Sequence, residues 1–218
     1  MSGIAGILFF DGDADSRPAV SCLVNAMSHR GPEGNSLWIQ NNVGFGHCLL
    51  RSTPESFHEN LPHTDVSSSL TITADARLDN RNELFAKLGL LSREKAGLGD
   101  GELILETYKK WGKDCACTLM GDFAIAIWDH RQKILYCARD HLGAKSLAFV
   151  CNERFFAFAS ESEALLSLPG ISSKPNEELV AHILLPAFQD FKQKKSWLIE
   201  VDGLMAGEYL VLTPEGKP

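Results

Sequence analysis

The sequence predicts an α+β fold in which two stacked β-sheets are covered by helices. Short apolar runs bounded by turn residues occur in pairs, a pattern typical of β-hairpins, and the clearest pairs are 120–129 with 133–140 and 147–150 with 155–159. Segments with helical spacing come in groups between such pairs. A parallel α/β sheet would alternate single strands with single helices, so this order favours the α+β class.

The composition is that of an ordinary globular chain. At 218 residues, with 44% hydrophobic and 22% charged residues, it can bury the core of one domain. A net charge of −7 argues against a nucleic-acid surface, and the one basic cluster, Lys192, Lys194 and Lys195, is typical of a solvated loop. Because no apolar run approaches the roughly 18 residues of a membrane span and no signal peptide is evident, we expect no membrane contact and a cytoplasmic location.

The cysteines and histidines give no metal-site pattern. The six cysteines lie in apolar segments without a Cys-x-x-Cys pair: Cys22, Cys48, Cys115, Cys117, Cys137 and Cys151. We interpret all six as buried free thiols in a reducing compartment. His47, His58 and His63 are too far apart in the sequence to indicate a metal site.

The first strand is expected at the very start of the chain. Small residues within 3–6 allow another backbone to approach, and the apolar run 7–10 ends at the turn signal 11–12. Ser2 is therefore a candidate nucleophile, because the α-amine of a first residue can act as the base for its own hydroxyl. An ordinary strand start explains the same residues. With Met1 retained, the amine also lies one residue too early to assist Ser2.

From residue 18 to residue 69 the sequence predicts a helix, a turn, a hairpin and a loop. Apolar spacing favours a helix over Pro18–Met27, with the proline in its first turn. Glycine and proline within 28–34 predict a rigid turn that presents His29, Arg30 and Glu33. The remaining segments are a hairpin and a polar loop: 37–39 paired with 43–50, then 51–69.

The middle of the chain predicts a buried strand followed by two helices. Alternating β-branched residues favour a strand over 70–74, and the polar segment 75–81 leads into a helix over 82–88. A second helix is expected over 102–111. Its predicted N-cap is Asp100, since a short carboxylate side chain can accept from the first free amides of a helix.

After the two strand pairs, the last part of the chain predicts two helices and two strand-like segments. The helices are expected over 161–168 and 176–185, and the strands over 197–201 and 209–212. Residues 214–218 have the proline and glycine content of a linker, so the predicted domain spans 1–213.

A series of short motifs follows along the chain: Ser2-Gly3-Ile4-Ala5-Gly6, His29-Arg30-Gly31-Pro32-Glu33, Gly46-His47, Gly99-Asp100-Gly101-Glu102, Gly121-Asp122-Phe123-Ala124 with Trp128-Asp129, Ala138-Arg139-Asp140-His141-Leu142-Gly143-Ala144-Lys145-Ser146-Leu147 and Phe158-Ala159-Ser160-Glu161. The series resembles the class II glutamine amidotransferase domain of the asparagine synthetase family, which includes the lasso-peptide cyclases and β-lactam synthetases. The resemblance covers nearly the whole chain. It implies the four-layer αββα sandwich of the N-terminal-nucleophile hydrolases, and a glutaminase that supplies ammonia to an ATP-dependent synthetase domain.

The residues that carry the family's nucleophile and carboxylate clamp differ in this chain. The family has a cysteine directly after the initiator methionine, where this chain has Ser2. The family's arginine for the glutamine carboxylate falls at Leu49. Arg51 is two residues further, on the same face of an ideal strand, so it is a candidate substitute for that clamp.

The oxyanion hole also differs. The resemblance places the family's Asn-Gly oxyanion pair at Asp75 and Ala76, and the glutamate that follows it at Arg77. An ionised Asp75 can only accept hydrogen bonds and cannot stabilise a developing oxyanion. Only Asp100, which corresponds to the family's partner for the substrate ammonium, matches. The resemblance therefore implies the family's framework around a degenerate glutaminase site.

These departures favour a glutaminase-inactive domain of an ATP-dependent amide-forming ligase. No cofactor or metal is expected in this domain. Because no Ser-Gly-Gly-x-Asp-Ser pyrophosphate loop occurs, ATP and Mg²⁺ are expected only in a synthetase domain downstream of Pro218 or on a partner. A ligase domain of this kind could also form a homodimer. Two alternatives stay open: an active amidohydrolase that uses Ser2, and a stand-alone interaction module without chemistry.

Two structural expectations follow from the charged and apolar residues. We expect Arg139, Asp140 and Lys145 to be structural, pairing with carboxylates or capping turns, because isolated charges would be costly to bury between two apolar strands. We also expect an apolar docking surface near 186–188 and the tail, where a synthetase domain would lie.

Overall fold

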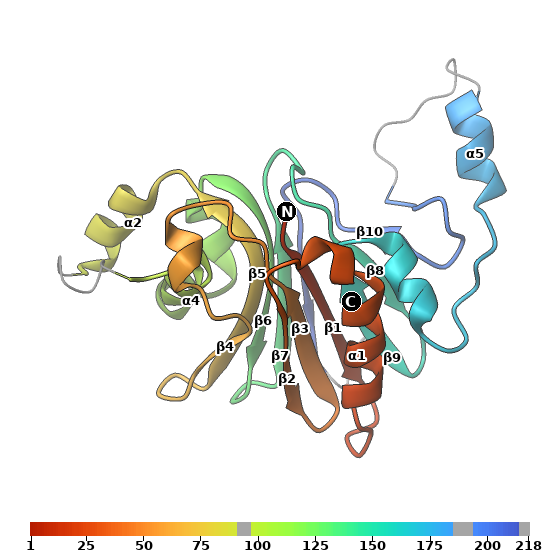
Figure 1. Ribbon diagram of the computed structural model, residues 1–218, viewed down its shortest axis with the longest axis horizontal. Helices are drawn as coiled ribbons and strands as arrows, with labels where there is room; N and C mark the ends of the chain where they lie inside the picture. Colours follow the sequence, from red (N-terminus) through yellow and green to blue (C-terminus); the bar gives the residue numbers. More distant parts are fainter. Residues whose placement is uncertain (91–96, 185–193, 214–218) are drawn as a thin grey trace.

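The computed structural model describes residues 1–90, 97–184 and 194–213, and it contains two antiparallel β-sheets that face each other (Figure 1). The first sheet has the strand order β10 (Asp202–Gly203), β8 (Ala148–Cys151), β9 (Phe155–Ala159), β1 (Gly3–Phe9), β3 (Val43–Cys48) and β2 (Asn35–Gln40). The second has the order β11 (Tyr209–Leu212), β7 (Ile134–Arg139), β6 (Gly121–Asp129), β5 (Leu70–Leu78) and β4 (His63–Asp65).

Helices cover the outer face of each sheet. Helix α1 (Arg17–Ala26) lies on the first sheet, and α2 (Arg81–Leu88) and α4 (Asp100–Trp111) lie on the second (Figure 1). Within the described residues, the other helical segments are the short turns η1 (Ser28–Arg30), η2 (Glu55–His58), η3 (Gly112–Thr118) and η4 (Ser162–Ser167) and the helix α5 (Glu177–Leu184). The result is the four-layer αββα sandwich that the sequence predicts.

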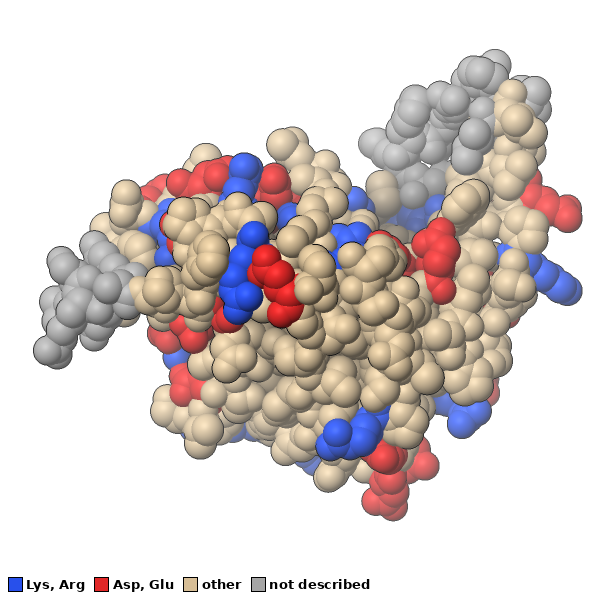
Figure 2. Space-filling view, in the orientation of Figure 1, with Lys and Arg blue, Asp and Glu red and all other residues tan. Residues whose placement is uncertain are grey.

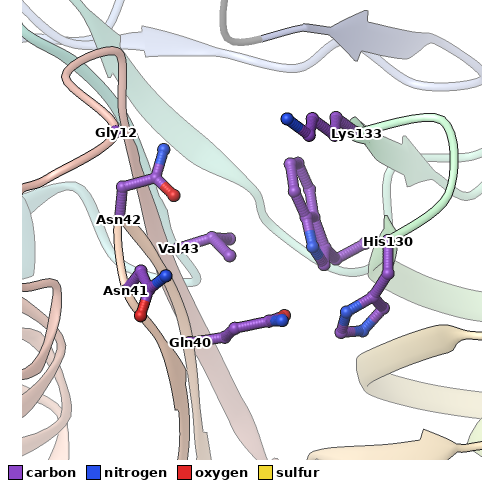
Figure 3. A pocket seen from close by; sticks show the side chains of 8 residues that line it. Gly12, Gln40, Asn41, Asn42, Val43, His130 and Lys133 are labelled. Atoms are coloured by element: carbon purple, nitrogen blue, oxygen red, sulfur yellow. The ribbon is translucent and has the colours of Figure 1, made fainter.

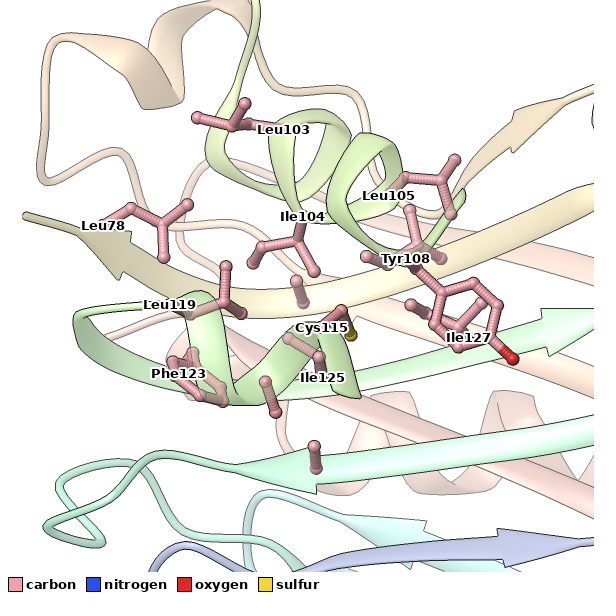
Figure 4. Packing of buried hydrophobic residues seen from close by; sticks show 14 of the residues in the cluster. Leu78, Leu103, Ile104, Leu105, Tyr108, Cys115, Leu119, Phe123, Ile125 and Ile127 are labelled. Carbon is pink, nitrogen blue, oxygen red and sulfur yellow. The ribbon is translucent and has the colours of Figure 1, made fainter. Parts of the chain in front are cut away.

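Three groups of buried side chains separate these layers. One fills the space between α4, η3 and the second sheet, where the helix directs Leu103, Ile104 and Tyr108 onto Ile125 and Ile127 (Figure 4). A second lies between α1 and the first sheet. The third fills the space between the two sheets. Burial on both faces explains why the strand sequences are nearly continuous apolar runs.

Strand β1 lies in the interior of the first sheet, as its sequence predicts. It pairs with β3 along one edge and with β9 along the other. A side chain at Gly6 would collide with Phe45 and Phe158, so the glycine leaves room for two aromatic rings between the sheets. On the opposite face, Gly46 of β3 allows Val24 of α1 to approach closely. The first residues of the chain are therefore fixed in the core.

Some element boundaries differ from the predictions. Strand β5 continues through 75–78 because each of these residues pairs with β6. Residues 162–167 form the 3₁₀ turn η4 rather than an α-helix. Residues 197–201 are not a strand, since the Val201 amide donates to the Leu198 carbonyl (3.2 Å) and closes a turn. The predicted polar loop 51–69 contains η2 and the short strand β4.

Three predictions about single residues or segments need correction or lie outside the described residues. Asp100 is not an N-cap: the helix cap is Gly99, and Asp100 is the first helical residue. The prediction that all six thiols are buried is wrong, because Cys22 and Cys117 are exposed and Cys151 is half-buried. The docking surface at 186–188, the linker 214–218 and Lys192 lie outside the described residues.

The described part of the chain holds no helix long and apolar enough to cross a membrane. Within the same residues, no group of three or more histidine, cysteine, aspartate or glutamate side chains could hold a metal ion. On the face seen in Figure 2, positive and negative side chains are interspersed among uncharged ones.

Candidate functional site

Ser2 lies at the end of the sandwich where β1 begins. Its Oγ donates to the Leu50 carbonyl oxygen (3.2 Å) and accepts from the Leu50 amide (3.1 Å). The Ser2 carbonyl oxygen accepts from Arg30 Nε (3.0 Å) and Nη2 (2.8 Å). The hydroxyl is thus held by the segment that follows β3, and the backbone of Ser2 is held by an arginine.

Arg30 joins this end of β1 to residues from both sheets. Its Nη1 donates to Glu161 Oε1 (3.0 Å), and its Nη2 lies 3.7 Å from Asp75 Oδ2. The arginine is the last residue of η1, Asp75 belongs to β5, and Glu161 is the second residue after β9. Hydrogen bonds to Arg30 and His29 outweigh the effect of partial burial and hold the pKa of Glu161 below its usual value.

Asp75 forms a second ion pair across the sandwich. Its Oδ1 accepts from Lys145 Nζ at 2.8 Å, and the side chains of Asp75 and Lys145 are only 7% and 11% exposed. Burial raises the pKa of Asp75, and the positive charges of Lys145 and Arg30 oppose that rise. Two cations therefore face one buried carboxylate. We call Arg30, Asp75, Lys145 and Glu161 the charged cluster.

Asp75 and Ala76 project from opposite faces of β5. Asp75 faces the space between the sheets and the charged cluster, whereas Ala76 packs against the side chains beneath α4. The next residue, Arg77, is exposed, and its Nη2 lies 3.3 Å from Asp79 Oδ2 and 3.2 Å from Asp122 Oδ2. The side chain of Arg77 is therefore held at the protein surface.

Asp100 already has partners within the chain. Its Oδ2 accepts from the Leu78 amide (3.2 Å), and its Oδ1 is paired with Arg81. Arg81 also donates to the Leu98 carbonyl oxygen (2.7 Å). Burial raises the pKa of Asp100, and Arg81 opposes that rise. The carboxylate of Asp100 is thus paired with an arginine of α2.

The residues expected near a substrate carboxylate do not form a clamp. Strand β3 ends at Cys48, so the argument that Arg51 shares a strand face with Leu49 is wrong. Arg51 Nη1 instead pairs with Glu33 Oε2 (3.0 Å), and its guanidinium lies over the Phe57 ring. Leu49 contributes its amide to the Gly34 carbonyl oxygen (2.8 Å) and brings no charge.

Three residues of the charged cluster were not identified from the sequence as parts of this site. The sequence indicated that Arg30 is presented by a rigid turn and that Lys145 pairs with a carboxylate, and the structure confirms both; it did not indicate that they meet at Asp75. Glu161 gave no signal beyond its motif. Glu59, outside the charged cluster, is another buried titratable residue that the sequence did not indicate. Burial raises its pKa to about 7, and its Oε1 accepts from the Gly101 amide (2.9 Å).

The chain matches the family model described as a glutamine amidotransferase domain over residues 1–217. Among curated proteins it is 30% identical to asparagine synthetase [glutamine-hydrolyzing] 3 of Bacillus subtilis, over 80% of this chain and 29% of that protein. It is also 30% identical to a putative asparagine synthetase [glutamine-hydrolyzing] 2 of Methanocaldococcus jannaschii, over 81% of this chain and 37% of that protein.

Solved structures show the same fold at low sequence identity. One is described as the allosteric regulatory enzyme of purine biosynthesis, with a TM-score of 0.65, 16% identity and coverage of 98% of this chain and 47% of that chain. Another is a glutamine phosphoribosylpyrophosphate amidotransferase from B. subtilis, with a TM-score of 0.60, 17% identity and coverage of 76% and 43%.

The two facing sheets covered by helices and the match over nearly the whole chain agree on a glutamine amidotransferase domain. The chain belongs to the glutamine amidotransferase domain family and is related to the asparagine synthetases. It spans about a third of the length of the curated synthetases named above.

Proposed function

We propose that this chain is a glutaminase-inactive amidotransferase domain of an ATP-dependent, amide-forming ligase. The observation that carries the proposal is the charged cluster. Asp75, which the resemblance assigns to the oxyanion position, is engaged by Lys145 at 2.8 Å, with Arg30 at 3.7 Å. A hydrolytic site needs a preorganised donor at the place where negative charge develops, and a buried carboxylate supplies the opposite charge.

The substrate contacts support the same conclusion. A glutamine substrate carries a carboxylate and an ammonium group, and each needs a buried partner of opposite charge. Leu49 offers no charge to the carboxylate, and the side chain of Arg51 is paired with Glu33. Asp100 could receive the ammonium only by giving up Arg81. Glutamine would therefore bind with its carboxylate unpaired and in competition with an existing ion pair.

The ligase part of the proposal rests on chain length. The matched region covers 29% and 37% of the two synthetases named above, so the rest of each relative has no counterpart among these residues. We place ATP and Mg²⁺ binding in such a further region, on the same chain or on a partner. The amine for amide formation would then come from the acceptor substrate or from free ammonia rather than from glutamine.

The test is a stepwise restoration of the pocket, measured as glutamate formed from glutamine. We expect no detectable turnover in Ser2→Cys with Met1 removed, although a thiolate is a far better nucleophile than a hydroxyl. The missing oxyanion donor should lower the rate by roughly 10²–10³-fold. The unpaired glutamine carboxylate should weaken binding by about 2–5 kcal/mol.

Turnover should require further substitutions that rebuild the clamp and the oxyanion hole. These are Leu49→Arg, Asp75→Asn and Ala76→Gly, with Arg77→Glu as a fourth change. Removal of Met1 is checked by mass spectrometry in every variant, and a Ser2→Ala version of the full combination is the matched control. Robust glutaminase activity from Ser2→Cys alone would contradict the proposal.

One observation favours a second candidate, an amidohydrolase that uses Ser2 on another substrate. The Ser2 hydroxyl is half-buried at the start of a core strand, and the chain's terminal amine is close enough to lower the pKa of Asp75. The candidate requires removal of Met1, because the base must be the α-amine of Ser2 itself. An intact mass that retains Met1 excludes it.

A further inference from the structure

A cavity of about 290 Å³ lies at the end of the sandwich opposite Ser2 (Figure 3). The turn between β2 and β3 forms one wall, and the turn between β6 and β7 forms the other. Its lining residues are Gly12, Gln40, Asn41, Asn42, Val43, Trp128, His130 and Lys133. Since β1 runs between the two ends of the molecule, the cavity lies about 20 Å from Ser2. It is therefore separate from the charged cluster.

Several polar side chains around this cavity have no partner in the described protein. The Lys133 ammonium group, the Gln40 carboxamide and the Trp128 indole N–H make no hydrogen bond or ion pair among the described residues. Figure 3 shows Gln40 and Lys133 extending into the space from opposite walls. By contrast, Asn42 Nδ2 is used, donating to the Phe9 carbonyl oxygen (2.7 Å). The unpartnered groups provide mainly hydrogen-bond donors.

The wall at β6 is aromatic and fixed in place. Trp128 is only 5% exposed, and its ring lies edge-on to the ring of His130, with centroids 6.4 Å apart. His130 is held by Thr71, with 2.9 Å between Nε2 and Oγ1, and by the edge of Trp38. Val43 adds an apolar surface on the facing wall. Val43 and the part of Trp128 that faces the cavity thus offer apolar surface to a flat ring.

The charged side chains around the cavity favour a negatively charged ligand. Lys133 is the one lysine or arginine among the lining residues, and none of them carries a carboxylate. The nearby Asp129 is occupied, because its Oδ1 accepts from the Arg131 and Gln132 amides and its Oδ2 accepts from the Gln132 side chain. Burial lowers the pKa of His130 and favours its neutral form. Lys133 thus gives the cavity a positive charge within an acidic protein.

We propose that this cavity binds a small planar carboxylate, with its ring against Trp128 and its carboxylate paired with Lys133. The volume is near the lower end of the range for small-molecule sites, which limits the ligand to one or two fused rings. An aromatic ring with a charged edge group matches an aromatic wall next to a free ammonium and two further donors. The site is independent of any chemistry at Ser2.

The proposal is tested by titrating the full chain, labelled with ¹⁵N, with indole-3-carboxylate. The indole N–H signal of Trp128 is assigned by its loss in Trp128→Phe. We expect this signal to shift saturably, while the signals of Trp111 and Trp197 stay constant. The neutral indole-3-carboxamide should bind at least about tenfold more weakly, since a hydrogen bond to a charged group contributes roughly 1.5–3 kcal/mol.

Lys133→Gln is the decisive variant. Lys133 has a φ of +53°, and glutamine, like lysine, is a non-glycine residue of similar length. The substitution therefore removes the charge and leaves the demands on the backbone of this turn unchanged. It should weaken binding of the carboxylate by at least about tenfold. The matched control is Lys174→Gln, which changes an exposed lysine outside the cavity and should leave the affinity unchanged. Folding of both variants is verified from the rest of the spectrum.

The proposal is overturned by any of three results. The Trp128 signal fails to shift at millimolar carboxylate; the carboxamide binds as tightly as the carboxylate; or Lys133→Gln and Lys174→Gln bind alike. The first excludes the site, and the other two exclude the assigned chemical class.

Discussion

At the scale of single residues, Asp75 is a buried carboxylate whose charge is balanced within the fold. A carboxylate with 7% exposure is costly to bury, and here Lys145 and Arg30 compensate its charge. The pair therefore stabilises the fold only while both members are present. The ion pair of Asp75 with Lys145 links β5 to the turn between β7 and β8.

This arrangement predicts strong coupling between Asp75 and Lys145. Asp75→Asn and Lys145→Gln should each destabilise the protein by roughly 3 kcal/mol, because each leaves an uncompensated buried charge. The double variant should lose much less than the sum of the two. Chemical denaturation of the four proteins measures the coupling free energy. A value below about 0.5 kcal/mol, as for an exposed pair, would contradict the burial argument.

His47 provides a second prediction, this time about pH. Both ring nitrogens are buried without hydrogen-bond partners among the described residues, and burial lowers the pKa of the ring to about 4 from 6.5. Because the unfolded chain takes up this proton first, His47 should destabilise the fold as pH falls from about 6.5 to 4. The loss should approach roughly 3 kcal/mol. Replacement by leucine should remove it.

Glu59 has the opposite effect on the pH dependence of stability, so its contribution must be distinguished from that of His47. Its pKa is raised to about 7, so the folded state takes up this proton first and gains stability as pH falls from 7 towards 4.5. The measurement is therefore the difference in unfolding free energy between the parent and His47→Leu at pH 7 and pH 4.5. His58→Leu, a change at an exposed histidine at the end of η2, is the control. A difference that does not vary with pH would refute the assignment.

The sequence could predict some of these residues and not others. Ser2 was found because its position next to a buried strand is a local property of the chain. The departures at Leu49 and Asp75 were visible because each position lies near a recognisable motif. The charged cluster was not predictable, since Arg30, Asp75 and Glu161 are distant in the sequence and come together only when the two sheets pack.

At the scale of elements, the turn between β7 and β8 is organised by two charged residues that the sequence indicated as structural. Arg139 donates to the carbonyl oxygens of Gly143, Lys145 and Leu204, at 2.5–2.6 Å. Asp140 is fully buried and accepts from the amides of Leu142, Ala144 and Lys145. These backbone bonds hold the pKa of Asp140 below its usual value, against the effect of burial.

Asp140→Ala should therefore destabilise the protein by roughly 3 kcal/mol, because it leaves buried amides without acceptors. Since the same turn presents Lys145 to Asp75, the loss should include part of the coupling described above. Thermal unfolding measures the effect, and Asp114→Ala, a change at an exposed aspartate, serves as the control. Unchanged unfolding in Asp140→Ala would show that the turn does not depend on this carboxylate.

The predicted hairpins were correct where strands that are neighbours in the sequence also pair in a sheet. The pairs β2–β3, β6–β7 and β8–β9 each join neighbouring strands, so local turn signals were sufficient. The prediction of a strand over 197–201 was wrong. The apolar residues Leu198 and Val201 are buried, but they lie in a turn and not in a strand. The extension of β5 through 75–78 was missed because its polar residues are paired by tertiary contacts.

At the scale of the whole molecule, the two ends of the sandwich have different character. The end near Ser2 is closed by ion pairs that connect η1, β5 and the segments after β7 and β9. The opposite end contains the cavity with unpartnered donors. The end near Ser2 is therefore a junction of charged side chains from several elements. Space for a small molecule remains at the far end of the sheets.

The final prediction concerns this junction. Arg30→Met removes the only residue that contacts Ser2, Asp75 and Glu161 together among the described residues, and it leaves two carboxylates close to each other. Hydrogen exchange should therefore accelerate at the amides of 3–5 and 74–76. Exchange near 43 and 128 should stay constant, because local opening need not involve the whole sheet.

Arg131→Met is the matched control for this experiment. Arg131 is exposed at the opposite end of the sandwich, where it donates to Ser67 and Ser69. Its replacement should leave exchange near Ser2 unchanged. If Arg30→Met instead accelerated exchange equally at both ends, the protein would open as one cooperative unit. The charged cluster would then contribute to global stability without acting as a local closure of the Ser2 end.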